Sequence, residues 1–369
     1  MFELTINKQD LLNPLLTVIG AVDKKQAFVI LSNILVTVKQ EELVLTATDL
    51  EIEMTSHAPC VSADAADHQS TVPAKKMVDI IRSLDDEPPL KLRFDAQHVV
   101  IKQGRSQFKI ATMPADDYPC IQGDLSQLNL TVPRMVLMHL LQSTAFAMAQ
   151  QDVRVYLNGL FIELDGQSIT TVTMDGHRMA VCKWTCDTKH SPHRLLLPKK
   201  GVQEMMRLLQ SVPDESVILL AGVNHIKLVT QQHTFFSKLI ESPFPPYSRA
   251  IPRTQDKHVI IDRELLKRAL SRIIILAHEK SHAVLLSIQD QQLTLIANNQ
   301  EQEEALESLA AQTQGDALQI GVNAHYLLDV LNYIHDGLLR LSFTDRDSSI
   351  LVESLEDEQY QYVIMPMKI

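Results

Sequence analysis

Four side chains of types that bind zinc lie close together in the stretch "CKWTCDTKHSPH", residues 182–193. They are Cys182, Cys186, His190 and His193. The C-x3-C spacing is looser than that of the usual zinc knuckle. In addition, residues 181–184 alternate as in a strand, which would turn Cys182 toward one face of a sheet. We therefore favour buried thiols over a metal centre.

A second group of reactive types is "DGHR", residues 175–178. Asp175 and His177 could act as acid and base, with Arg178 as a clamp for an oxyanion. The alternative is a turn at the end of a strand, whose side chains point to opposite faces, and we favour it. A hydrolase or metal enzyme built on residues 175–193 remains the alternative function, since no P-loop or G-x-S-x-G signature occurs elsewhere.

The composition limits the classes of function. A formal charge of -11 argues against a generic nucleic-acid binder that is coated in lysine. With 45% hydrophobic residues the chain can build sizeable cores. No run of about 18 apolar residues and no signal peptide is present, and the four cysteines form no disulfide-like framework. We expect a cytoplasmic protein.

The elements that position these residues recur three times along the chain. "VPAKKMVDIIRSL" starts at Val72, "LPKKGVQEMMRLL" at Leu197 and "VNAHYLLDVLNYI" at Val322, and 197 minus 72 and 322 minus 197 each give 125. A second helical series places Lys8, Arg134 or Arg263 in its first turn. Runs of period two, typical of strands, separate the helices.

Each repeat therefore predicts an α+β domain with two helices packed on an antiparallel sheet. The predicted domains are residues 1–124, 125–253 and 254–369.

Together with the threefold repeat, the stretches "YLNGLFIEL", "DGHRMAV", "NNQEQEEA" and "YVIMPMKI" resemble, in order and spacing, the bacterial DNA polymerase III beta subunit, the sliding clamp. The resemblance runs from end to end. It implies a ring-shaped, head-to-tail homodimer without catalytic activity, cofactor or metal, which encircles duplex DNA and tethers the replicative polymerase. Twelve helices of about 10 Å each would line a hole of roughly 30 Å.

The resemblance also implies DNA contacts. Lys25, Gln151 and Arg154 match loop positions that touch DNA in the family, whereas Val155 stands where relatives have a tyrosine. Basic residues also gather in the helical segments, Lys199 and Lys200 among them, and favour a weak, sliding contact with the DNA backbone.

The dimer contact that the resemblance implies pairs the first domain with the third domain of the partner. It uses apolar Phe108, Ile275 and Leu276, and basic Lys75, Lys76 and Arg105 facing an acidic run. The acidic residues are Glu301, Glu303, Glu304 and Glu307.

The apolar C-terminal tail has two possible roles, a strand end or one wall of a binding site. The strand end accounts for the tail up to Met365, which we align with Met113 and Phe244 in the other repeats. By resemblance the tail lines a groove for short peptides of the polymerase alpha subunit, the clamp loader, repair polymerases, ligase and mismatch repair factors. Met174, Ala250, Lys368 and Ile369 depart from the family pattern, so the pocket depth should differ. The groove residues are Leu157, Met174, Gly176, His177, Arg178, Met179, Pro245, Arg249, Ala250, Val363, Met365, Pro366, Met367, Lys368 and Ile369.

Overall fold

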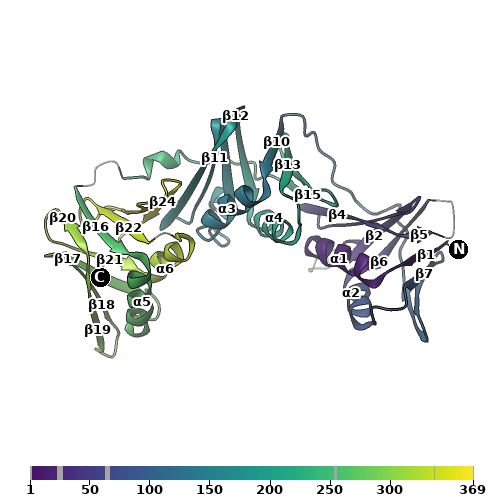
Figure 1. Ribbon diagram of the computed structural model, residues 1–369, viewed down its shortest axis with the longest axis horizontal. Coiled ribbons are helices and arrows are strands. Elements are labelled where there is room, and N and C mark those ends of the chain that lie inside the picture. Colours follow the sequence, from purple (N-terminus) through teal and green to yellow (C-terminus); the bar gives the residue numbers. More distant parts are fainter. Residues whose placement is uncertain (1, 23–27, 63–66, 253–255, 336, 369) are drawn as a thin grey trace. The chain divides into compact units, whose positions relative to one another are not determined.

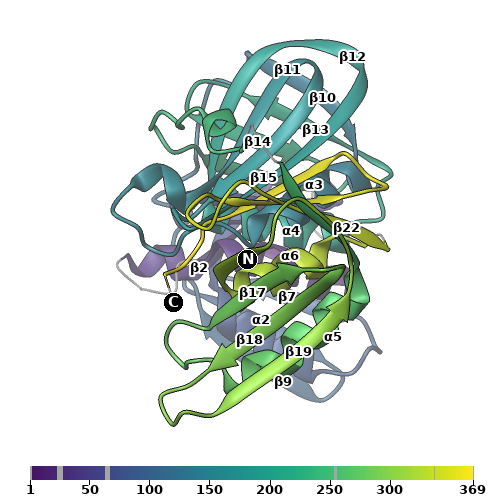
Figure 2. The same ribbon diagram turned by 90° about the vertical axis from the view of Figure 1, so that its left-hand side faces the viewer.

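The computed structural model describes residues 2–22, 28–62, 67–252, 256–335 and 337–368 (Figures 1 and 2). The chain divides into two compact units. The first unit holds Met1–Met135 and Gln203–Leu239, and the second holds Val136–Val202 and Ile240–Ile369. None of the described helices combines the length and the apolar character needed to cross a membrane.

The first unit contains two antiparallel sheets and helices α1 (Lys8–Val18) and α2 (Ala74–Ser83), together with most of α4 (Lys199–Ser211). The smaller sheet has the order β5 (Val61–Ser62), β1 (Phe2–Ile6), β7 (Leu90–Phe94), β8 (His98–Gln103), β9 (Ser106–Ala111). The larger sheet has the order β10 (Leu128–Pro133), β13 (Ser216–Ala221), β14 (His225–Val229), β15 (His233–Lys238), β4 (Ile52–Pro59), β3 (Glu42–Thr48), β2 (Asn33–Lys39), β6 (His68–Pro73).

The second unit repeats this plan, with most of α3 (Arg134–Ala145), α5 (Arg263–Ile273) and α6 (Ala324–Tyr333). Its larger sheet has the order β11 (Gly159–Met174), β12 (Arg178–Pro198), β24 (Tyr360–Ile364), β23 (Ile350–Ser354), β22 (Leu338–Phe343), β16 (Lys257–Asp262), β20 (Gln312–Gln314). Its smaller sheet has the order β19 (Glu304–Ala310), β18 (Gln292–Asn298), β17 (Ala283–Gln289), β21 (Leu318–Asn323).

The sequence pattern explains these elements. Helix α2 buries Ala74, Met77, Val78 and Ile81, which recur at the spacing of one helix face and pack on the sheet. Strand β4 alternates buried and half-buried side chains along most of its length, as expected for a strand with one face on the core. The predicted α+β class, with helices on antiparallel sheets, is confirmed.

The threefold repeat is visible in the hydrogen bonds that close each repeat. The main-chain N–H of Met113 donates to the carbonyl of Thr71 at 3.3 Å, that of Ile240 to Leu196 at 2.8 Å, and that of Met367 to Gly321 at 2.8 Å. The acceptors are 125 residues apart and the donors 127. The residues that correspond in the three repeats are therefore Met113, Ile240 and Met367, and the expected alignment of Met113 with Phe244 and Met365 is wrong. The tail is part of the fold up to Met367.

Candidate functional site

The "DGHR" segment forms the turn between β11 and β12, as predicted. Oδ1 of Asp175 accepts hydrogen bonds from the main-chain N–H groups of His177 and Arg178, both at 2.9 Å. Gly176 has a φ of +91°, which favours glycine, and a Cβ there would lie 2.7 Å from Nη2 of Arg154. The Asp175 carboxylate is thus used to fix the turn and is not free to act as a general base.

Arg178 is held on all sides and is only 12% exposed. Its Nε donates to Asp175 Oδ2 at 3.0 Å, Nη1 to Asp329 Oδ2 at 2.5 Å, and Nη2 to the carbonyl of Phe146 at 2.9 Å. The guanidinium also lies 4.5 Å from the ring centre of Tyr326, a cation–π distance. Arg178 therefore ties the turn to α6 through Asp329, and its donors point away from solvent.

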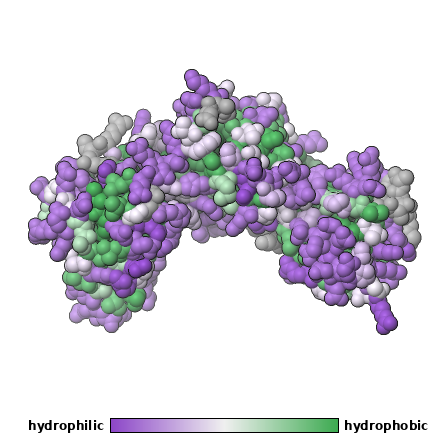
Figure 3. Space-filling model, in the orientation of Figure 1, coloured by the Kyte–Doolittle hydropathy of each residue, from purple (hydrophilic) through white to green (hydrophobic). Residues whose placement is uncertain are grey.

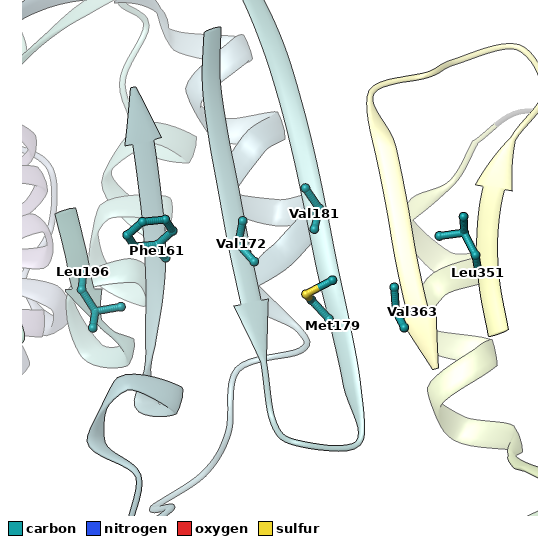
Figure 4. Packing of buried hydrophobic residues seen from close by; sticks show 7 residues of the cluster. All are labelled: Phe161, Val172, Met179, Val181, Leu196, Leu351 and Val363. Atoms are coloured by element: carbon teal, nitrogen blue, oxygen red, sulfur yellow. The ribbon is translucent and has the colours of Figure 1, made fainter. Parts of the chain in front are cut away.

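Beside this turn lies an apolar cluster, which we call the groove cluster (Figure 4). Its side chains come from β11, β12, β23 and β24, and the register pairs Val172 with Val181 and Met179 with Val363. The buried members are Phe161, Val172, Met179, Val181, Leu196, Leu351 and Val363. The half-buried rim consists of Tyr156, Met174, Ile240, Phe244, Tyr247 and Ile251. A half-buried apolar rim on a buried apolar floor is the surface that an apolar peptide side chain can enter.

Aromatic rings and one carboxylate shape the rim. The rings of Phe161 and Phe244 are stacked with centres 4.5 Å apart. The hydroxyl of Tyr247 donates to Glu163 Oε2 at 2.9 Å, and burial together with that carboxylate raises the pKa of Tyr247 to about 12. Tyr247 therefore remains a neutral donor across the physiological range and fixes its ring against the cluster.

A cavity of about 540 Å³ adjoins the rim. It is lined by Arg249, Ala250, Ile251, Pro252, Thr344, Asp347, Ser348 and Ser349. Ile251 belongs to both the cavity and the rim, so apolar cluster and polar cavity form one continuous surface.

Five of the fifteen predicted groove residues lie in the groove cluster or line the cavity. Met174, Met179 and Val363 are in the groove cluster, and Arg249 and Ala250 line the cavity. Leu157 is buried, Pro245 is half-buried and His177 is exposed, whereas Ile369 lies outside the described residues.

The tail joins the turn directly. The main-chain N–H of Met365 donates to the carbonyl of His177 at 2.8 Å, while the Met365 side chain is 48% exposed. Pro366 and Met367 are half-buried, and Lys368 is exposed.

Sequence reasoning found Met179 and Val363 of the buried floor but missed its members on β11, Phe161 and Val172, because the alternation along β11 changes phase. Phe161 and Val172 belong to one cluster although one number is odd and the other even. Register irregularities between Leu164 and Gly166 and between Gly166 and Ser168 break the alternation. Simple period-two counting therefore assigns these two residues to opposite faces.

Four of the five residues expected at DNA lie in two neighbouring segments. Arg154 pairs with Asp152 at 2.9 Å, and these hydrogen bonds lower the pKa of Asp152 to about 2. Nζ of Lys199, at the start of α4, lies 3.5 Å from the carbonyl of Ala149, which brings α4 beside the segment that carries Gln151 and Arg154. Burial lowers the pKa of Lys199. Lys200 follows it in α4, and Lys25 lies outside the described residues.

The residues expected at the dimer contact are mostly on the surface. Ile275 is 76% exposed, Leu276 and Phe108 are half-buried, and Lys75, Lys76 and Arg105 are exposed. In Figure 3 apolar patches interrupt the mostly hydrophilic surface of the second unit, on its left-hand side.

Two members of the acidic run are engaged within the chain. Glu307 forms an ion pair with Arg272, which lowers the pKa of Glu307, and Glu303 accepts from Nδ2 of Asn299 at 2.6 Å. Glu301 and Glu304 are exposed.

Among the residues that the structure describes, the possible zinc ligands form no metal site. Cys182 and Cys186 are buried, and burial raises the pKa of Cys182 to about 12, which disfavours the thiolate that zinc requires. Nδ1 of His193 lies 2.9 Å from the carbonyl of Ser191, and the His190 side chain is outside the described atoms. No three described His, Cys, Asp or Glu residues are placed to hold a metal ion.

Comparison with known proteins covers the chain from end to end. Three family models match: the N-terminal domain of the DNA polymerase III beta subunit over residues 2–122, its central domain over 131–246 and its C-terminal domain over 248–368. The beta sliding clamp of Pseudomonas aeruginosa is 40% identical over 367 residues, covering 99% of both chains, and that of Escherichia coli K12 is 37% identical over 365 residues, with 99% of both covered.

Solved structures agree with this. A crystal structure of the DNA polymerase III subunit beta from Pseudomonas aeruginosa has a TM-score of 0.95 at 39% identity and covers 100% of both chains. Another structure of that clamp, with the same TM-score, identity and coverage, is bound to griselimycin. The beta sliding clamp of Caulobacter crescentus has a TM-score of 0.95 at 31% identity, again with 100% of both chains covered. The chain therefore belongs to the DNA polymerase III beta subunit family, the bacterial sliding clamps, which are non-catalytic processivity factors.

Proposed function

We propose that two copies of the chain close head to tail into a ring around duplex DNA and tether the replicative polymerase during processive synthesis. The observation that carries this proposal is the threefold repeat, closed in each repeat by the same main-chain hydrogen bond. A ring needs equivalent units that follow one another, whereas a catalytic site does not. Head-to-tail closure pairs the surface of the first domain with that of the third.

Retention on DNA should be topological. A chain with a formal charge of -11 has little direct affinity for phosphates, and what it has weakens steeply with salt. The weak contacts come from Lys25, Gln151, Arg154, Lys199 and Lys200. The loaded protein should stay on a closed circular plasmid in 1 M salt and leave when the plasmid is linearised. Equal retention on linear and circular DNA would exclude a ring.

The surface that would bind a peptide of the polymerase lies on the second unit. The groove cluster, its aromatic rim and the tail form an apolar surface beside a cavity of about 540 Å³, which suits a short linear peptide with a few apolar anchors. Met174, Met179 and Met365 supply flexible side chains that can repack around different partners. The griselimycin complex of the Pseudomonas relative supports a ligand site in this family.

A few apolar anchors give affinities of around micromolar, about -8 kcal/mol. Calorimetry with a glutamine–leucine type clamp-binding peptide tests the groove, using Met365→Ala as the perturbing variant. Met135→Ala is the matched control, because Met135 is also an exposed methionine but is not a member of the groove cluster. Removal of Lys368 and Ile369 alone leaves the Met367–Gly321 bond in place and separates the contribution of the last side chains from damage to the fold.

The partners follow from this mode of binding. A site that accepts short peptides of micromolar affinity lets the polymerase alpha subunit, the clamp loader, repair polymerases, ligase and mismatch repair factors exchange on one ring in the cytoplasm. Competition experiments test whether these partners share one site: each partner's peptide should displace the glutamine–leucine type peptide. Simultaneous binding of two peptides to one protomer would contradict a shared groove.

A further inference from the structure

In the first unit, the last turn of α1 receives an arginine from α4. Arg207 donates through Nη1 to the carbonyl of Leu16 at 2.9 Å and through Nη2 to the carbonyl of Thr17, while its Nε donates to Glu204 at 2.7 Å. Carbonyls at the end of a helix lack helical partners and carry partial negative charge, so a cation there is favourable. Glu204 holds the guanidinium in place.

The second unit uses the same arrangement with the arginine supplied from another element. Asp329 of α6 holds Arg178, and Arg178 donates to the carbonyl of Phe146, just after α3. Glu204 and Asp329 are 125 residues apart, the interval of the repeat. In both units an acid of a second helix therefore holds an arginine that donates to carbonyls near the end of the first helix of the preceding repeat: in the last turn of α1, and directly after α3.

A third set of these groups has no partner among the residues that the structure describes. Asp79 and Arg82 of α2 precede Glu204 and Arg207 by 125 residues, and both are exposed. Neither side chain forms a hydrogen bond or an ion pair with the residues that the structure describes.

At the helix end that would receive this pair, the Arg272 carbonyl accepts from the main-chain N–H of Ile274, and no described side chain donates to it or to the Ser271 carbonyl. Helix α5 corresponds to α1 with an offset of 255 residues, because the hydrogen bond from Val22 to Ile19 recurs from Ala277 to Ile274. The carbonyls equivalent to those of Leu16 and Thr17 belong to Ser271 and Arg272, which are exposed.

The sizes of the side chains that would meet at the two helix ends are also complementary. Because Gly20 has no side chain, Glu204 packs directly on it after the end of α1; a Cβ at Gly20 would lie 1.9 Å from Glu204 Oε2. The residue equivalent to Gly20 after α5 is Ile275, 76% exposed, and the acid equivalent to Glu204 is Asp79, which is shorter by one methylene. A glycine thus faces the long acid, and a large side chain would face the short one.

We propose that α2 of one protomer docks on the end of α5 of the other in the dimer. Arg82 donates to the carbonyls of Ser271 of the partner subunit and Arg272 of the partner subunit, and Asp79 orients the Arg82 guanidinium. This inference rests on the proposed homodimer and adds to its expected contacts an arginine cap that the chain already uses within each unit.

Sedimentation velocity over a dilution series tests the cap. Arg82→Ala should raise the Kd of the dimer by about tenfold or more, since hydrogen bonds to a charged group are lost. Arg82→Lys should recover little of this, because lysine cannot reach two carbonyls with a planar fork. Arg340→Ala is the charge-matched control, since Arg340 is an exposed arginine on β22. A wild-type dimer whose Kd is unchanged by Arg82→Ala would overturn the inference, whereas a monomeric wild type would overturn the homodimer.

A double-mutant cycle tests the size complementarity. Asp79→Glu should weaken the dimer because the longer acid collides with Ile275 of the partner subunit. The same substitution should have a smaller effect in an Ile275→Gly background, which recreates the pairing of Gly20 with Glu204. Additive effects of the two changes would show that these residues do not meet and would overturn the proposed docking.

Discussion

Replacing Arg178 by alanine should release the Asp175–Met179 turn from α6 and from the end of α3. The change removes side-chain hydrogen bonds to Asp175, Asp329 and the Phe146 carbonyl. Bonds to a charged group each contribute about 1.5–3 kcal/mol. The Asp329 carboxylate is 41% exposed and regains water, so its bond counts for least. We expect a net local loss of roughly 3 kcal/mol, about a hundredfold in the opening equilibrium.

Hydrogen exchange measures this opening directly, because the amides of His177 and Met365 are protected by bonds that depend on the turn. Their exchange should accelerate by about a hundredfold, and peptide affinity should fall because only protomers with an ordered turn bind. Arg194→Ala is the control: Arg194 lies in the same strand, 76% exposed, in a surface ion pair with Glu163. Unchanged exchange at His177 in the Arg178 variant would refute the role assigned to Arg178.

Three further results are expected. Combined Ile275→Ala and Leu276→Ala should yield a monomer at low micromolar concentration in sedimentation, since the exposed apolar contact is lost; a persistent dimer would place the contact elsewhere. Gly176→Ala should weaken the peptide-binding turn by about 1–2 kcal/mol, visible as faster exchange at His177, because φ is +91° and the added Cβ meets Arg154. Burial lowers the pKa of His68, so its contribution to stability is complete above pH 6.5 and declines as the pH falls below it; His68→Phe should flatten the pH dependence of urea unfolding between pH 7 and 5.

The helices, the strands and the repeat could be predicted because each follows from local period and spacing. The side of the sheet on which Phe161 lies could not be predicted. The register irregularities near Gly166 change the alternation of side chains, and no local pattern in the sequence marks them. The resemblance predicts Arg178 in the groove, yet its donors reach Asp329, 151 residues away. Such long-range pairing depends on tertiary packing, which no local pattern in the sequence contains.

The same repeat predicts how many peptides each protomer binds. The Asp175 turn recurs at Asp49, whose Oδ1 accepts from the N–H groups of Glu51 and Ile52. With that offset of 126 residues, the position of Met179 in the groove is taken in the first unit by Glu53. Glu53 faces Phe236 in the register where Met179 faces Val363.

Glu53 makes this counterpart unsuitable for an apolar peptide. Its Oε2 accepts from the N–H of Ile121 at 2.8 Å, so the chain's own segment closes on the position, and burial raises the pKa of the Glu53 carboxyl. An apolar anchor placed there would have to displace Ile121 and leave a carboxylate unpaired. Calorimetry should therefore give one peptide per protomer. Glu53→Gln should keep that stoichiometry because the amide oxygen still accepts from Ile121, and two peptides per wild-type protomer would contradict the reasoning.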